Sequence, residues 1–415
     1  MSTPRLARPG LLGALGLVLA ACPARREEGS GAQTPRSAPT DEATPPATAG
    51  DVGSTAAAND DTNDDADESA HHVVFADRTS QTYLLLLPDS PVAAPTREAL
   101  AELVKKKLPG ADDEPEVELL LDLVATEPRP VQSDPSLDAA ARSEIRHADL
   151  LGLHVALLPL TTPGEDPLVS PATLLDPIAT RELSEADRAS LPARRQVLVL
   201  RAHYRNRYGV RGLRLLQTLV RIVAADRKAL VHDPDTGETM DVTAFTRRRL
   251  QSTLGNVADQ IVVVPFPDPR HGKGFVRMST RGMRRFGSVD LELDGLPREP
   301  AVLEAATLLL QGLAYRMARA GEYDQEGFAV EVDDEIELTY RDVATAYASE
   351  TQRVPRCDGC PERVRVHLVE RPAEPHDPVE HVVARVVAPR LLSASPRYDH
   401  PAWTRKAIAE LLGVR

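Results

Sequence analysis

The sequence is poor in the residues and motifs that carry strong chemical signals. Its 415 residues include 3 cysteines and 1 tryptophan, and aromatic residues make up 4% of the chain. It lacks the motifs G-x-S-x-G, S-x-x-K, H-E-x-x-H, G-x-G-x-x-G and the P-loop, which place catalytic or phosphate-binding groups in many enzymes. The sequence therefore predicts no catalytic residue and no cofactor, and it favours a protein that is not an enzyme.

Long apolar runs are also scarce, and the clearest one lies at the N-terminus. Residues 11–20, LLGALGLVLA, follow Arg5 and Arg8. A basic segment before a short apolar run is typical of a secretory signal peptide, and this run is too short to span a bilayer. Leu19 begins the quartet LAAC, which ends at Cys22. The quartet resembles the lipobox of bacterial lipoproteins, which implies removal of residues 1–21 and acylation of Cys22 with chains such as palmitate.

The lipobox resemblance implies a cell-envelope protein that is anchored to a membrane through Cys22. Each buried methylene of a lipid chain contributes about 0.8 kcal/mol to membrane binding, so acylation replaces a spanning helix. Pro23 stands where an aspartate favours the inner membrane, so we expect the outer membrane, with the protein facing the periplasm. The alternatives are an ordinary signal peptide and an uncleaved anchor.

Residues 22–70 consist mainly of Ala, Thr, Pro, Gly, Ser and Asp. Such a segment buries too little apolar surface to offset the entropy of ordering, so the sequence predicts a disordered tether. Residues 59–68, NDDTNDDADE, lack the glycine of a calcium loop and are interpreted as an acidic spacer. The net charge of −13 favours solubility, and nucleic acid is not an expected partner.

Beyond residue 70, strand-like and helical segments alternate, which is typical of a sheet covered by helices. We expect an α/β or α+β fold with a mixed sheet. Residues 71–320 form the predicted main domain, with two halves that meet near residues 161–193 as an alternative division, and residues 321–415 form a smaller α+β unit. The predicted strands are 82–88, 117–124, 153–160, 196–204, 228–233, 260–266, 274–280, 288–295, 328–332, 335–340, 362–371 and 381–388, and the predicted helices are 95–108, 212–225, 300–320, 342–349 and 401–412.

Residues 278–295, MSTRGMRRFGSVDLELDG, precede the long predicted helix. The segment 278–320 resembles part of a group of uncharacterised bacterial proteins with T-R-G-[ML]-x-x-F-G, a short strand and a helix. The resemblance implies a fold element and no chemistry. Gly282 and Gly287 are predicted turn residues that place Phe286 under the following strand.

Arginines gather in one stretch with interleaved tyrosines, RAHYRNRYGVRGLR at residues 201–214. They predict a surface that binds anions, such as the phosphates of lipids or glycans. The alternative is a solvated face balanced by nearby Asp and Glu. The candidate anion-binding residues are Arg201, Arg205, Arg207, Arg211 and Arg214.

Residues 271–274, HGKG, lack the spacing of a P-loop and are predicted to form a polar turn.

Near the C-terminus, Cys357, Cys360, His376 and His381 follow the pattern C-x2-C-x15-H-x4-H, which fits a zinc finger. The two strands predicted around the histidines form an antiparallel hairpin about 26 Å long. That hairpin places the cysteines and the histidines at opposite ends, whereas zinc needs all ligands within about 2.0–2.3 Å of one point. The sequence therefore predicts no zinc site here.

Disulfides persist in an oxidising compartment, so the sequence favours one between Cys357 and Cys360, which the turn dipeptide Asp-Gly between them can bring together. A redox pair and a partial metal site are the alternatives for these two cysteines.

The sequence as a whole favours a membrane-anchored lipoprotein with a non-enzymatic role, either structural or in binding an envelope anion or protein. An envelope enzyme with a site of dispersed residues, and a metal-binding or redox module at the two cysteines, remain the alternative functions.

Overall fold

The computed structural model describes residues 72–76, 78–88, 93–109, 114–127, 151–161, 168–205, 209–250, 254–322, 330–347, 354, 359–374, 377 and 382–414. All of them belong to one compact unit, Ala66–Arg415. The predicted signal peptide, Cys22 and the tether lie outside the described residues. In the described part of the chain, no helix combines the length and apolar character needed to cross a membrane.

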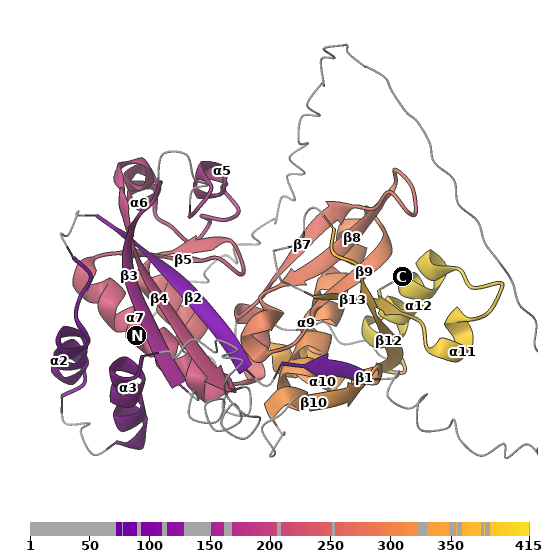
Figure 1. The fold of residues 1–415 in the computed structure, drawn as a ribbon. Helices are drawn as coiled ribbons and strands as arrows, with labels where there is room; N and C mark the ends of the chain where they lie inside the picture. The colour runs from indigo at the N-terminus through magenta and orange to yellow at the C-terminus, as the bar shows by residue number, and fades with distance from the viewer. Residues whose placement is uncertain are drawn as a thin grey trace, which may run out of the picture. The chain divides into compact units, whose positions relative to one another are not determined.

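The chain has an α+β fold, as the sequence predicts, with helices packed against two main sheets (Figure 1). A 5-stranded antiparallel sheet has the order β3-β4-β2-β5-β6, and a 6-stranded mixed sheet has the order β11-β12-β13-β9-β8-β7. β1 and β10 form a further pair. The strands are β1 (His72–Phe75), β2 (Arg78–Leu87), β3 (Leu151–Pro159), β4 (Gln196–Arg205), β5 (Leu230–Asp233), β6 (Glu238–Met240), β7 (Val262–Pro267), β8 (Phe275–Arg281), β9 (Asp290–Pro297), β10 (Val330–Asp333), β11 (Glu335–Thr339), β12 (Arg363–Arg371) and β13 (Val383–Val387).

The helices follow the segments predicted from the sequence, with additional short turns. Within the described residues, each predicted strand and helix has a counterpart except the strand predicted at 117–124. The α-helices are α2 (Arg97–Lys107), α3 (Pro115–Ala125), α5 (Pro171–Leu175), α6 (Glu185–Ser190), α7 (Gly209–Arg227), α8 (Val242–Phe245), α9 (Pro300–Glu322), α10 (Tyr340–Ala346), α11 (Arg390–Ser393) and α12 (His400–Leu412). The shorter helical turns are η2 (Leu191–Ala193), η4 (Thr246–Leu250), η5 (Leu254–Asp259) and η6 (Met283–Phe286).

The strand predicted at 117–124 is wrong, because this segment forms the helix α3. Pro115 occupies the first turn, where its missing N–H costs nothing, and acidic side chains there favour the helix dipole. Val117, Leu120 and Val124 are buried at helical spacing. The run VELLLDLV fits either period, and the flanking proline and acidic residues favour the helix.

Both faces of the five-stranded sheet are buried along residues 83–87 of its central strand β2. Along β2, Tyr83, Leu85 and Leu87 belong to the core shared with α7, α2 and α3, whereas Leu84 and Leu86 face a second apolar cluster. That second cluster includes side chains of the segment with α5 and α6, such as Leu174 and Leu183. The two faces explain why the strand is apolar throughout rather than alternating.

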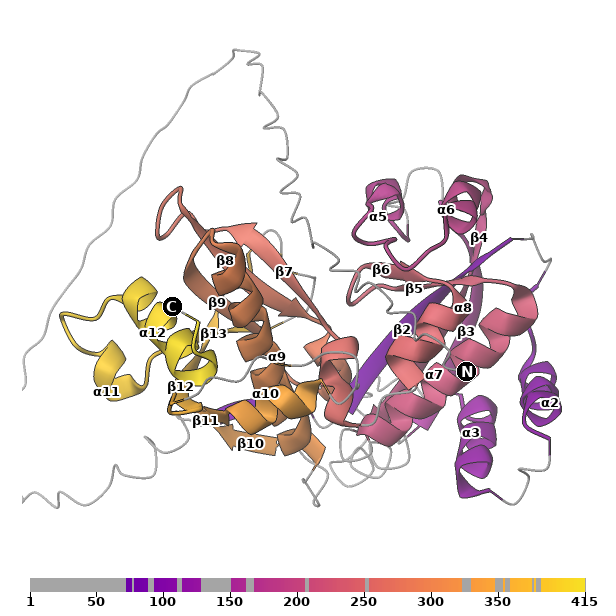
Figure 2. The same ribbon diagram turned by 180° about the vertical axis from the view of Figure 1, so that it is seen from behind.

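The six-stranded sheet differs, because only one of its faces is apolar. Leu291 and Leu293 of β9 pack in the core with α9, which lies in front of the sheet in Figure 2. β12 and β13 are antiparallel neighbours, which confirms the predicted hairpin, and β13 continues the sheet by pairing parallel to β9. Strands on both sides of the predicted boundary between residues 320 and 321 therefore share one sheet.

The turn between β8 and β9 has the form predicted for the T-R-G segment. Gly282 and Gly287 both adopt left-handed backbone angles, with φ of 106° and 71°, at the two ends of η6. Phe286 is buried between them, as expected. Arg285 of the same turn is also fully buried, and its guanidinium contacts Asp233 of β5 at 2.9 Å. This ion pair joins the turn of one sheet to a strand of the other.

A buried ionic cluster surrounds that contact. Besides Arg285, Asp233 accepts a hydrogen bond from Arg249 at 3.1 Å, and Arg249 also donates to Glu238 at 3.1 Å. Arg248 donates to Glu238 at 2.6 Å. Arg248 and Arg249 lie in η4, a π-helical turn, and the side chains of Arg249 and Arg285 are both 0% exposed. Such charges are stable only when opposite charges compensate them.

Candidate functional site

The charged face of the six-stranded sheet is the candidate functional site. Glu292 and Asp294 of β9 alternate with Leu291 and Leu293, so their carboxylates lie on the face opposite the core. Both acidic residues are 0% exposed. Burying a carboxylate is costly unless cations and hydrogen bonds compensate its charge. The neighbouring strands and loops supply these cations.

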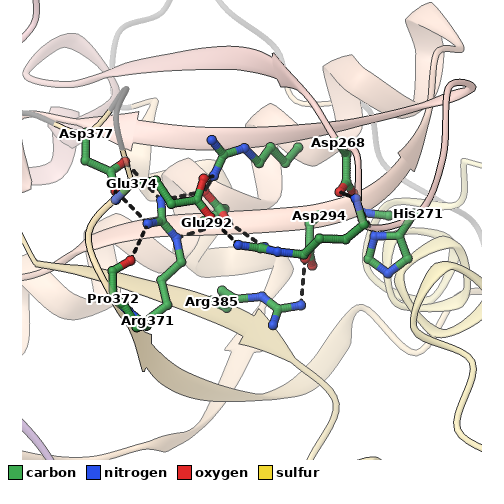
Figure 3. Close-up of polar contacts among 12 residues, drawn as sticks. Asp268, His271, Glu292, Asp294, Arg371, Pro372, Glu374, Asp377 and Arg385 are labelled. Carbon is green, nitrogen blue, oxygen red and sulfur yellow. Dashed lines mark hydrogen bonds and ion pairs between the residues drawn. The ribbon is translucent and has the colours of Figure 1, made fainter. Parts of the chain in front are cut away.

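Glu292 lies at the centre of an arginine–carboxylate cluster (Figure 3). Arg277 of β8 donates to its Oε2 at 2.8 Å, and Arg371 of β12 donates to both of its oxygens at 3.2 and 2.8 Å. Arg371 also donates to Asp377 at 2.5 Å, and Glu374 lies 2.6 Å from Arg277. The segment after β12 is thereby held against the face of the sheet.

In this cluster, the direction of each pKa shift follows from how far ion pairs and hydrogen bonds outweigh the cost of burying a charge. Burial alone raises the pKa of Asp377, but the hydrogen bonds from Arg371 and the backbone outweigh burial and lower it to about 2. The pKa of Arg371 is raised, because its carboxylate partners outweigh burial. Arg371 therefore stays charged, and the arginines of this cluster are already paired with carboxylates, which leaves little excess positive charge for an added anion.

A second group, the His–Asp cluster, adjoins the first and consists of Asp268, His271, Asp294 and His400. Nδ1 of His271 lies 2.7 Å from Oδ2 of Asp268, and Nε2 of His400 lies 2.6 Å from Oδ1 of Asp294. The two imidazole rings stack with centroids 5.5 Å apart. Figure 3 shows Asp268, His271 and Asp294 side by side at one end of the charged face.

The turn between β7 and β8 positions the first half of this cluster. Asp268 accepts hydrogen bonds from the backbone N–H of Arg270 at 3.1 Å and of Gly295 at 2.8 Å. Gly272 takes a left-handed φ of 104°, so the chain reverses and returns as β8. The polar turn predicted for residues 271–274 is present. Its histidine is directed toward Asp268 and is 18% exposed.

The start of α12 positions His400, which belongs to the second half of the His–Asp cluster. Asp399 caps the helix by accepting from the N–H of Ala402, which places His400 at the first helical residue. Nδ1 of His400 lies 2.6 Å from the hydroxyl of Tyr398. Gly295 has φ of 66°, and a Cβ there would lie 3.1 Å from the ring of His400. A glycine at this position therefore permits the close approach of His400 to β9.

Asp294 is a buried carboxylate that neighbouring cations keep ionised. Burial raises its pKa, but His400, Arg385 and His271 together lower the pKa well below its ordinary value. Its Oδ2 accepts from Arg385 at 2.6 Å and from Arg270 at 3.3 Å. Its Oδ1 is buried and forms an ion pair with His400, whose Nε2 lies 2.6 Å away.

The arrangement offers a set of metal-ligand atoms. One ligand atom each from Asp268, His271 and Asp294 lies within 4.8 Å of the others. Imidazole and carboxylate ligands suit zinc and similar transition metals. The same Asp–His pair is also the geometry in which a carboxylate orients an imidazole as a general base.

The site residues predicted from the sequence have different outcomes. Cys22, Cys357, His376 and His381 lie outside the described residues, so the zinc-finger pattern stays untested. Cys360 is disulfide-bonded, and its pairing with Cys357 stays a prediction.

The predicted anion-binding residues lie on β4 and α7. Arg201 is exposed and donates to Thr82 at 2.9 Å, and Arg211 and Arg214 are exposed on α7. Arg207 and the side chain of Arg205 lie outside the described residues. The described members therefore form no assembled site, and their role in anion binding stays a prediction.

The His–Asp cluster was missed by the sequence analysis. The available signals were the alternating acidic residues of 290–294 and the histidine of the predicted polar turn, which stand far apart from His400 in the chain. Comparison with protein families, curated proteins and solved structures finds no significant match. The site must therefore be interpreted from its own geometry.

Proposed function

We propose that this protein is a lipid-anchored cell-envelope protein with a non-enzymatic binding role, and that its ligand or partner binds at the charged face of the six-stranded sheet. The quartet LAAC ending at Cys22, directly after an apolar run, supports the anchor. The outer membrane, with the folded unit facing the periplasm, is the proposed location.

The observation that carries the binding role is the position of partly exposed charges around a buried, fixed network. Arg270 and Arg385 have side chains that are 36% and 29% exposed, while their partners Glu292 and Asp294 are buried. Glu374 is 28% exposed, and its partner Arg277 is buried. Their geometry is thus set before any partner arrives, which lowers the entropy lost on binding. Charges of both signs favour a ligand or protein surface with complementary charges over a simple anion.

The anchor is tested by replacing Cys22 with serine in a bacterial host. We expect the unaltered protein to incorporate radiolabelled palmitate and to sediment with membranes, and the C22S variant to do neither. Matched expression of a Cys360→Ser variant controls for loss of any cysteine and should retain the label. Membrane association of C22S at the level of the unaltered protein would contradict the anchor.

One observation favours an enzyme as the second candidate. The Asp268 carboxylate holds Nδ1 of His271, which leaves Nε2 as a base at a partly exposed position. Incubation of the purified protein with a panel of esters and phosphoesters tests this candidate. Turnover that disappears in a His271→Ala variant would support an enzyme and would count against the non-enzymatic role.

A further inference from the structure

We propose that Asp268, His271 and Asp294 bind one divalent transition-metal ion of the zinc type. This site is separate from the C-terminal cysteines and does not depend on the lipid anchor. It lies where the β7–β8 turn, β9 and α12 meet, at the edge of the charged sheet face (Figure 3).

The spacing of the donors supports a shared ion. The three ligand atoms lie within 4.8 Å of one another. Ligands bonded to one tetrahedral zinc ion at about 2.0–2.2 Å stand about 3.3–3.6 Å apart. Side-chain shifts of about 1–1.5 Å therefore bring the three donors to bonding distance. One imidazole and two carboxylates form a set that favours a transition metal over calcium or magnesium, which bind oxygen ligands.

The buried oxygen of Asp294 is an independent indication. Oδ1 belongs to a fully buried residue, and its close partner is Nε2 of His400, 2.6 Å away but outside hydrogen-bond alignment. Its partner atom Oδ2 is held by Arg385 and Arg270, so the carboxylate is fixed with Oδ1 directed toward the histidines. His400 compensates part of the charge on this buried oxygen, and a bound cation would supply a second partner.

The remaining contacts determine how each side chain would bind. Asp268 uses Oδ2 for the N–H of Gly295 and for His271, and Oδ1 for the N–H of Arg270. These backbone donors fix the carboxylate as outer partners fix metal ligands. Without metal, a hydrogen bond of 2.7 Å joins Nδ1 of His271 to Oδ2 of Asp268. A bound ion would take the place of the shared proton and link the same two atoms.

The two arginines are the main opposing charges. Of the two oxygens of Asp294, Arg270 and Arg385 contact only Oδ2, and they leave Oδ1 to the proposed ion. His400 lies 2.6 Å from Oδ1 and stacks on His271, which makes it a positioning residue for both ligands. The partial exposure of His271 gives the ion an entry path from solvent.

Calorimetric titration of zinc chloride into the chelator-treated full-length protein in detergent tests the site. We expect one ion per chain, and we expect His271→Ala to weaken binding at least a hundredfold. Cobalt provides a second measurement, because its visible absorption bands report coordination directly and should disappear in the same variant. Near-ultraviolet circular dichroism establishes that the variant is folded, and if it is not, Asp294→Asn and Asp268→Asn replace it in the titration.

The structure offers a matched control. His367 lies on the same sheet, and its Nε2 stands 3.1 Å from Asp334, so it is also a histidine paired with an aspartate. His367→Ala and the Cys357→Ser, Cys360→Ser double variant should bind zinc as the unaltered protein does. Absence of stoichiometric binding, binding that survives in all three cluster variants, or loss of binding in the cysteine variant would each overturn the proposal.

Discussion

The carboxylate of Asp233 lies between two guanidinium groups that solvent does not reach, and its replacement by asparagine leaves them without their shared counterion. Arg285 donates to both of its oxygens at 3.1 and 2.9 Å, and Arg249 donates at 3.1 Å. Asparagine keeps the shape of the side chain and removes the charge. We therefore expect the D233N variant to be strongly destabilised.

The size of the effect follows from what each arginine retains. Arg249 keeps its hydrogen bond to Glu238 at 3.1 Å, whereas Arg285 keeps only a longer contact with the carboxylate of Asp235, at 4.0 Å. Removal of one partner of a buried ion pair costs about 3–5 kcal/mol, so D233N should cost about 4 kcal/mol. With a urea dependence of about 3 kcal/mol per molar, the unfolding midpoint should fall by about 1.3 M.

Urea unfolding at pH 7, followed by circular dichroism, measures this change. Burial raises the pKa of Asp233, but Arg285 and Arg249 outweigh burial and lower it, so its stabilisation is present at pH 7 and is lost as pH falls below the ordinary range of a carboxyl group. Glu102→Gln is the control, because Glu102 is 74% exposed in its contact with Lys105. Equal midpoints for D233N and the control would refute the assigned role of the cluster.

Three further predictions concern buried and closely packed positions. Burial lowers the pKa of His232 to about 4, so stability should be complete above the unfolded pKa of about 6.5 and fall by about 3 kcal/mol as pH approaches 4, and urea midpoints of a His232→Gln variant should lack that dependence. A Cβ on Gly312 would lie 2.6 Å from Val343, so Gly312→Ala should lower the free energy of unfolding by about 1–3 kcal/mol, whereas Gly274→Ala, with no atom within 4 Å, should be near neutral. Gly295→Ala should cost about 1–2 kcal/mol, because its φ of 66° is unfavourable for alanine, and a thermal melt with an unchanged midpoint would contradict this.

Local sequence patterns predicted the helices and strands of this fold well where the spacing of the apolar residues fits only one of the two. The stripe of α9 is an example, since Leu303, Ala306, Leu310, Leu313 and Met317 are all buried. The segment 117–124 was wrong because a continuous apolar run satisfies both a buried strand and a buried helix. In such cases, the proline and acidic residues before the run are more informative than its hydrophobicity.

The candidate site was less predictable, because its residues meet only through tertiary contacts. Asp294 contacts Arg385 across 91 positions of sequence, and Asp268 binds the N–H of Gly295 across 27. Sequence alone shows acidic and basic residues on strands, for which solvent exposure is the usual expectation. Their burial depends on opposite charges that arrive from other strands and loops, and no local pattern records that pairing.

The outer strand β7 has a consequence for contacts between copies of this protein. Pro265 and Pro267 stand two positions apart in this strand, which pairs with β8 on one side and ends the six-stranded order on the other. Prolines two apart remove backbone donors from the same side of a strand. A neighbouring copy therefore finds few N–H groups there for pairing, so this edge resists joining sheets between molecules even at high protein concentration.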